Sequence, residues 1–230
     1  MLKIDKWLSS QLGYSAYNIN NLKDKNFNFL NYKYKNILIS IKSKKKIKNS
    51  FLKKNHIKLI EKNLTFIKNS KKKILKNNYF KNVRFANIFD KKLILDIAEN
   101  SFIKSRFFKD EDIKKNLARK IKRNWVLNFF RKKRGEYLIV SEFNKKVVGF
   151  LLVLKNKKNY TIDLIAVKKN YNNLGLGTKM IEFLENKVLK QNKVRIYVST
   201  QSDNKHSIKL YIKNKFKVKY TRYVYHFNGC

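Results

Sequence analysis

The chain has 230 residues, a formal net charge of +41 and no proline. This length allows one domain of roughly 140–150 residues together with a smaller unit. The longest apolar run, 147–154, is too short to span a bilayer, and the N-terminus has no apolar signal segment. We therefore expect a cytoplasmic protein without membrane insertion. The single cysteine and the spacing of the three histidines also predict no metal site.

The positive charge by itself does not indicate a nucleic-acid partner. The basic residues of the chain are mostly lysine and lie along its whole length. They accompany abundant Asn and Ile, a composition that a coding sequence rich in A and T would produce. Clustered arginine with exposed aromatic residues would have favoured nucleic acid. We expect instead that the charge steers small polyanions toward the protein.

The predicted elements fall into two units. A charged, Asn-rich connector at 71–81 separates a small N-terminal α/β domain, 1–78, from a second domain, 82–228. Apolar spacing in the second domain predicts helices and strands. Helices are expected at 90–101, 111–130 and 178–190 and after a cap at Ser202, Asp203 or Asn204. Strands are expected at 136–141, 147–154, 160–167, 194–200, 216–220 and 222–227. Asn214 is expected to end the last helix in a left-handed conformation.

The most informative segment runs from Tyr160 to Lys190. A strand-type run, YTIDLIAV, passes through KKNYNNLGLG into a helix that Gly175 and Gly177 open. Backbone N–H groups at a helix start are unpaired and favour an anion, and glycine lets a phosphate approach the backbone. The pattern predicts a pyrophosphate-binding loop, although glycine also serves tight turns that bind nothing.

Two motifs resemble the GNAT superfamily of acetyl-CoA-dependent N-acetyltransferases. The spacing from Asn172 through Gly175 to Gly177 is similar to its R/Q-x-x-G-x-G/A loop, with Asn172 at the Arg or Gln position. The segment 199–218 is similar to its N-x-x-A-x-x-x-Y-x-x-x-G-F signature, with Asn204 and Tyr211 at the same separation. In that segment Ser207 and Asn214 are taken to replace the Ala and the Gly.

The resemblance implies a mixed α/β GNAT fold, with a central, mostly antiparallel twisted sheet flanked by helices. It implies acetyl-CoA as co-substrate, direct transfer without an acyl-enzyme, and Tyr211 as the acid that protonates the CoA sulfur. The residues implied to bind acetyl-CoA are Ile165, Ala166, Val167, Asn172, Leu174, Gly175, Leu176, Gly177, Thr178, Asn204 and Tyr211. From the residues alone, Tyr211 also fits a core aromatic position and Asn204 a simple helix cap.

Three further segments resemble the dTDP-fucosamine (dTDP-4-amino-4,6-dideoxygalactose) N-acetyltransferase family. They are Trp7 to Gly13 (W-D-S-x-F-F-G in the family), Lys58 to Leu64 (L-V-E) and Ser105 to Phe107 (S-R-F), with Trp125 downstream. The resemblance implies acetylation of a nucleotide-linked amino sugar for surface polysaccharide, and it is compatible with a homodimer. It also implies that Arg106, Phe107 and Trp7 contact the acceptor.

Two carboxylates compete for the role of general base. Glu61 matches the acidic residue of the family's N-terminal domain, and Asp163 lies on the central strand. Strict alternation would place Asp163 on the same face as Ile165 and Val167. A salt bridge to lysine is the rival interpretation of Glu61, and an ion pair with Asp110 or Glu111 is the rival one for Arg106.

Two other functions stay open from sequence. One is a GNAT enzyme acting on another amine, such as a protein N-terminus or a small metabolite. The other is a basic nucleic-acid-binding protein on a degenerate acetyltransferase scaffold. The presence of Gly175, Gly177, Asn204 and Tyr211 argues against the second alternative, and the N-terminal unit favours the amino sugar over the first.

Overall fold

Ten strands form one twisted sheet in the computed structural model, which describes residues 2–20, 22, 27–70, 77–157, 159–188 and 194–229. The strand order is β1-β2-β3-β10-β4-β9-β8-β7-β6-β5. Only the pairs β2–β3 and β8–β9 are parallel. The predicted mixed α/β class with a mostly antiparallel sheet is therefore confirmed. Among the described helices, none has the length and apolar character that crossing a membrane requires.

The strands are β1 (Lys3–Ile4), β2 (Ser15–Asn20), β3 (Ile37–Ser43), β4 (Lys58–Ser70), β5 (Val83–Phe85), β6 (Tyr137–Phe143), β7 (Lys146–Asn156), β8 (Asn159–Val167), β9 (Val194–Gln201) and β10 (Lys217–Gly229). The α-helices are α1 (Lys6–Leu12), α2 (Asn49–Lys54), α3 (Lys91–Ser101), α4 (Arg106–Lys109), α5 (Lys115–Phe130), α6 (Leu176–Phe183) and α7 (Lys205–Lys213). Short 3-10 turns are η1 (Phe29–Tyr32), η2 (Asn77–Phe80), η3 (Ile88–Asp90) and η4 (Lys169–Tyr171), and α6 continues into one π-helical turn, η5 (Leu184–Val188).

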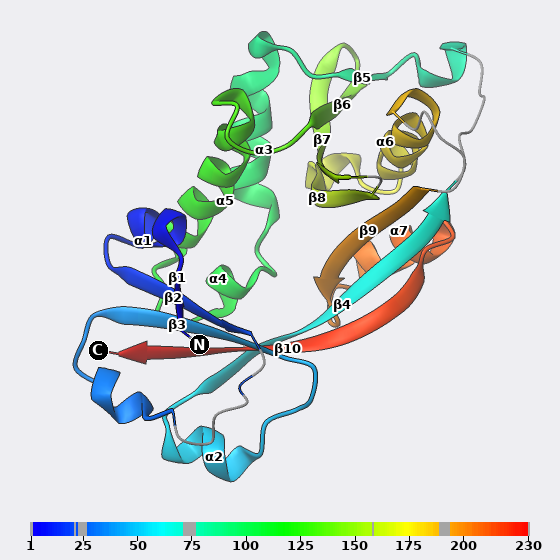
Figure 1. Cartoon of the computed structure of the whole chain (residues 1–230). Coiled ribbons are helices and arrows are strands. Elements are labelled where there is room, and N and C mark those ends of the chain that lie inside the picture. Colours follow the sequence, from blue (N-terminus) through cyan, green and yellow to red (C-terminus); the bar gives the residue numbers. More distant parts are fainter. Residues whose placement is uncertain are drawn as a thin grey trace.

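Helices cover both faces of the sheet (Figure 1). Helices α3 and α5 pack on one face through a core that includes Ile94, Val126 and Leu164. Helices α6 and α7 pack on the other face, around Met180 and Tyr211. The face on which each side chain of β8 lies therefore decides which helices it meets.

Strand β4 links the two sequence units that were predicted as separate domains. It lies between β10 and β9, and β10 in turn pairs with β3. Segments 1–78 and 82–228 thus share one sheet, and their division into domains stays a prediction. Residues 71–76 of the expected connector lie outside the described residues.

The predicted elements of the second unit are found, with differences at several ends. The turn at Asn144 and Lys145 has φ of 48° and 60°, which suits a two-residue hairpin. The prediction missed α4 and β5, and it began α5 four residues early. The two last predicted strands are one strand, β10, because no turn-forming residue separates them. A bulge at Lys219 absorbs the irregularity instead.

The left-handed residue after α7 is Lys215, with φ of 65°, and the prediction of Asn214 is wrong. Asn214 has φ of −85° and uses its side chain, which donates to the Leu210 carbonyl at 2.8 Å and to Thr178 Oγ1 at 3.1 Å. Counted from Tyr211, the glycine of the family signature also falls on Lys215. Asn214 therefore fastens α7 to α6, which carries the predicted phosphate loop.

Candidate active site

The sheet splits between β8 and β9. These parallel strands pair only from Asn159 to Ile162 on β8, opposite Arg195 to Val198 on β9, although both strands continue. Beyond that point β8 stays with β7, and β9 stays with β4. Within the described part of the chain, the backbone edge of β8 that follows Ile162 consequently has no strand partner on the β9 side (Figure 1). A cleft of about 830 Å³ opens there.

A β-bulge on β8 accompanies the split. Leu152 of β7 lies opposite Leu164 and Val153 lies opposite Ile162, so Asp163 is an extra residue. Its side chain bonds to α5, and Leu164 packs on the same side of the sheet. Ile165 packs instead against the α6 and α7 side. Simple alternation therefore fails, and Asp163 does not share a face with Ile165 and Val167.

Both oxygens of Asp163 are occupied. Arg134 donates from Nε to Oδ2 at 2.7 Å and from Nη2 to Oδ1 at 2.8 Å. The Trp125 indole donates to Oδ2 at 2.9 Å. A bidentate arginine pair fixes a carboxylate strongly. This arrangement suits a residue that holds the bulge better than one that accepts a proton.

Glu61 is the carboxylate with a free oxygen. It is 6% exposed and lines the cleft from β4. Oε1 accepts from Asn63 Nδ2 at 3.3 Å, whereas the buried Oε2 has no partner among the described residues. A salt bridge to lysine was the rival interpretation of Glu61. No such pair is among the ion pairs of the described residues. An unpartnered buried carboxylate oxygen is available to accept a proton.

The predicted phosphate loop lies at one end of the cleft. Gly175 has φ of 73° and caps α6 without a side-chain bond, so the first amides of the helix have no partner within it. The loop residues that line the cleft are Asn172, Gly175, Leu176, Gly177 and Thr178. Leu174 is half exposed and is not among the lining residues. The strand residues Ile165, Ala166 and Val167 line the cleft as well.

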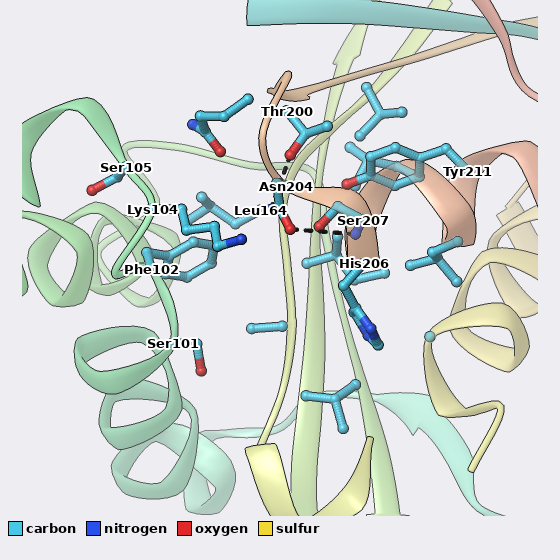
Figure 2. A pocket seen from close by; sticks show the side chains of 18 of the residues that line it. Ser101, Phe102, Lys104, Ser105, Leu164, Thr200, Asn204, His206, Ser207 and Tyr211 are labelled. Carbon is cyan, nitrogen blue, oxygen red and sulfur yellow. Dashed lines mark hydrogen bonds between the residues drawn. The ribbon is translucent and has the colours of Figure 1, made fainter. Parts of the chain in front are cut away.

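Asn204 and Tyr211 enter the cleft from α7 (Figure 2). Asn204 caps the helix, because Oδ1 accepts from the Ser207 amide at 3.4 Å while Nδ2 donates to Thr200 Oγ1 at 3.1 Å. Its contact with pantetheine stays a prediction. Tyr211 packs against Phe66 and Phe216 and is 3% exposed.

The Tyr211 hydroxyl has the protonation state that an acid needs. Burial raises its pKa well above the ordinary value, and a hydrogen bond with Ser207 opposes this only in part. The phenol therefore keeps its proton at neutral pH. Tyr211 is both a core aromatic and a lining residue of the cleft, so the two interpretations of this position are compatible.

Of the three residues assigned to the acceptor, two line the cleft. Arg106 lies with its guanidinium carbon 4.5 Å from the Phe107 ring centroid, and both residues line the cleft. The rival interpretation, an ion pair of Arg106 with Asp110 or Glu111, is not among the ion pairs of the described residues, and Asp110 contacts His226 at 2.5 Å. Trp7 is not a lining residue; its ring packs edge-on against Trp125 at 5.3 Å.

Sequence reasoning missed Lys122, which lines the cleft beside Trp125. The i, i+3 spacing of these two residues on α5 would have placed them together, but lysine is so frequent here that one more carried no signal. Ser207 and His206 also line the cleft. Among the described residues, no group of three or more His, Cys, Asp or Glu side chains could hold a metal ion.

Residues 95–216 match the acetyltransferase (GNAT) family, so the chain belongs to that family of acetyl-CoA-dependent N-acetyltransferases. It is similar to the spore coat polysaccharide biosynthesis protein SpsD of Bacillus subtilis, with 28% identity over 137 residues. That alignment covers 60% of this chain and 47% of the relative, about half of the relative's length.

Solved structures share the fold at low identity. A conserved Staphylococcus epidermidis protein of unknown function has a TM-score of 0.67 at 11% identity, covering 95% of this chain and 86% of that one. A putative GNAT acetyltransferase from Novosphingobium aromaticivorans has a TM-score of 0.57 at 9% identity, covering 84% and 75%. The first likeness extends over the N-terminal segment as well as the GNAT region.

The phosphate loop can be tested through Gly175→Val. A β-branched residue is strained at φ of 73°, so the loop should distort and acetyl-CoA should bind at least about tenfold more weakly in calorimetry. Gly13→Val is the matched control, because Gly13 also has positive φ at a helix end but lies outside the cleft. Equal acetyl-CoA affinity of both variants would remove the loop assignment.

Proposed function

We propose that this enzyme moves acetyl from acetyl-CoA to the 4-amino group of a dTDP-4-amino-4,6-dideoxyhexose for surface-polysaccharide synthesis. The observation that carries the catalytic part is the free, buried Oε2 of Glu61 in the cleft that the phosphate loop and Tyr211 also line. The choice of acceptor draws support from the S-R-F segment at Ser105 to Phe107 and from a relative whose name places it in polysaccharide biosynthesis.

Acetyl-CoA would lie along the split strand. The α6 amides from Leu176 to Thr178 would bind its pyrophosphate, and Asn172 would add one side-chain contact. The unpaired edge of β8 at Ile165 to Val167 would bind the pantetheine arm and polarise the thioester carbonyl. Asn204 would contact the same arm from α7. Leu174 does not line the cleft, so we assign it no contact with acetyl-CoA.

The transfer step needs one acceptor and one donor of a proton. The amine nitrogen attacks the thioester carbon, the bond from carbon to sulfur breaks, and an amide forms. Glu61 takes the proton that the nitrogen loses, directly or through water. Tyr211 gives its proton to the departing thiolate and yields free CoA. General acid–base catalysis of this kind contributes roughly 10²–10⁴-fold in rate.

The reaction can be tested by thiol release from acetyl-CoA. We expect release that depends on dTDP-4-amino-4,6-dideoxyhexose and exceeds that with a peptide N-terminus, with small metabolite amines and without amine. Mass spectrometry should find one acetyl group on the sugar nitrogen. Turnover with a peptide and none with the nucleotide sugar would contradict the proposed acceptor and leave the acetyltransferase in place.

Tyr211→Phe removes the proposed acid and keeps the ring. Its kcat should fall about 10²–10⁴-fold while acetyl-CoA affinity stays within about twofold. Tyr160→Phe is the control, because Tyr160 is another buried tyrosine and does not line the cleft. A Tyr211→Phe enzyme with unchanged kcat would return this residue to a packing role.

Replacing each carboxylate with its amide should distinguish the roles of Glu61 and Asp163. Glu61→Gln should lower kcat about 10²–10⁴-fold with little change in unfolding free energy. Asp163→Asn leaves Arg134 without its carboxylate and should cost about 1–3 kcal/mol in urea unfolding. If Asp163→Asn kept its stability and alone abolished the acidic limb of the pH–rate profile, where the general base loses its proton, the base would be Asp163.

A further inference from the structure

Among the cations that line the cleft, Lys122 and Arg106 are the two partly buried ones, and neither has a carboxylate partner among the described residues. Lys122 on α5 and Arg106 on α4 both line it, and neither belongs to an ion pair of the described residues. The Nε of Arg106 is buried and has no hydrogen-bond partner there. Unpaired cations removed from water are costly.

Aromatic rings hold Lys122 in place. Its ammonium lies 4.7 Å from the Trp125 ring centroid, 5.3 Å from Phe102 and 6.0 Å from Phe107. Cation–π contacts return part of the lost hydration, about 0.5–2 kcal/mol. They supply no counter-charge, and no described residue forms an ion pair with the ammonium, so its hydrogen-bond donors are available to another partner.

The charges around Lys122 leave an excess of positive charge at this wall of the cleft. Burial, followed by the neighbouring Arg106, lowers the pKa of Lys122 to about 8, and Arg134 acts in the same direction. Glu61 and Asp163 oppose the shift without cancelling it. Asp163 is already bound by Arg134. Burial and the positive charges of Arg106 and Arg222 also lower the pKa of Lys42 on β3, so positive charge extends behind Arg106.

We propose that Lys122 and Arg106 together bind a phosphate group of the acceptor, with Trp125 and Phe102 as the apolar wall beside it. Under the proposed function this group is the diphosphate of the nucleotide sugar, and the identity of the acceptor rests on that function. The guanidinium offers paired donors to phosphate oxygens and the ammonium a point charge. Lys122 and Arg106 come from α5 and α4, whereas the glycine loop that would take the pyrophosphate of acetyl-CoA opens α6.

The experiment measures binding of dTDP to protein saturated with CoA, so that the glycine loop is already occupied. Lys122→Met should weaken dTDP about 10–100-fold in calorimetry, the range for a hydrogen bond to a charged group. Lys120→Met is the matched control, because Lys120 is exposed on the same helix, and it should bind within about twofold of the unchanged protein. Equal affinity in both variants, or no dTDP binding by the unchanged protein, would overturn the proposal.

The pH dependence separates a binding role from a packing role. Binding of dTDP should weaken as pH rises above about 8, because Lys122 then loses its proton. In Lys122→Arg the side chain stays charged, so binding should no longer fall between pH 8 and 10. A Lys122→Arg enzyme with the same decline as the unchanged protein would contradict the assignment.

Thermal unfolding supplies a second readout. Since Lys122→Met removes a partly buried charge that has no carboxylate partner among the described residues, its Tm at pH 7 should match or exceed that of the unchanged protein. A lower Tm with unchanged dTDP affinity would assign Lys122 to packing and overturn the proposal.

Measuring turnover separates the proposed phosphate site from the proposed acceptor, because each can fail without the other. Selective loss of dTDP binding by Lys122→Met without acetylation of any dTDP sugar would support the phosphate site and contradict the proposed acceptor. Acetylation of the sugar with an unchanged KM in Lys122→Met would support the acceptor and contradict the phosphate site.

Discussion

The cleft depends on one extra residue in β8. A parallel pair of strands keeps its register only while both strands advance at the same rate, and the bulge at Asp163 ends that condition just after Ile162. The bulge is held by Arg134 and by the Trp125 indole. The Trp125 ring packs against Trp7, so the N-terminal segment helps to hold the residue that binds the bulge. The opening is therefore a packed feature of the fold.

Two carboxylates near the cleft, Asp110 and Asp163, are already held by other residues. Asp110 would be the natural partner of Arg106, but it is bound by His226 on β10. Burial lowers the pKa of His226 despite this contact, and the same contact lowers the pKa of Asp110. The carboxylate is thus committed to the link between β10 and the end of α4. With Asp163 likewise committed to Arg134, the only buried acid left free along this wall of the cleft, within the described residues, is Glu61.

Features that depend on a few neighbouring residues could be predicted from the sequence. The glycine loop, the cap at Asn204 and the hairpin turn at Asn144 follow from residue type and spacing, and each is found. The bulge at Asp163 escaped prediction because its cause is a tertiary contact with Arg134. Lys215 was passed over in favour of Asn214 because lysine is an unusual choice for a left-handed residue. The face on which each side chain lies thus needed the structure.

The position of Glu61 could not be predicted without the strand order. The motif identified the residue, but only the pairing of β4 with β9 brings it to the cleft. Lys122 raises a different difficulty. With 56 basic and 15 acidic residues, most lysines cannot find a carboxylate and remain in water, where an unpaired charge costs little. Net charge therefore says almost nothing about function in this chain. Burial is more informative, because a cation that has lost part of its water gains more from an anion, and Lys122 and Arg106 are two partly buried cations in the same cleft.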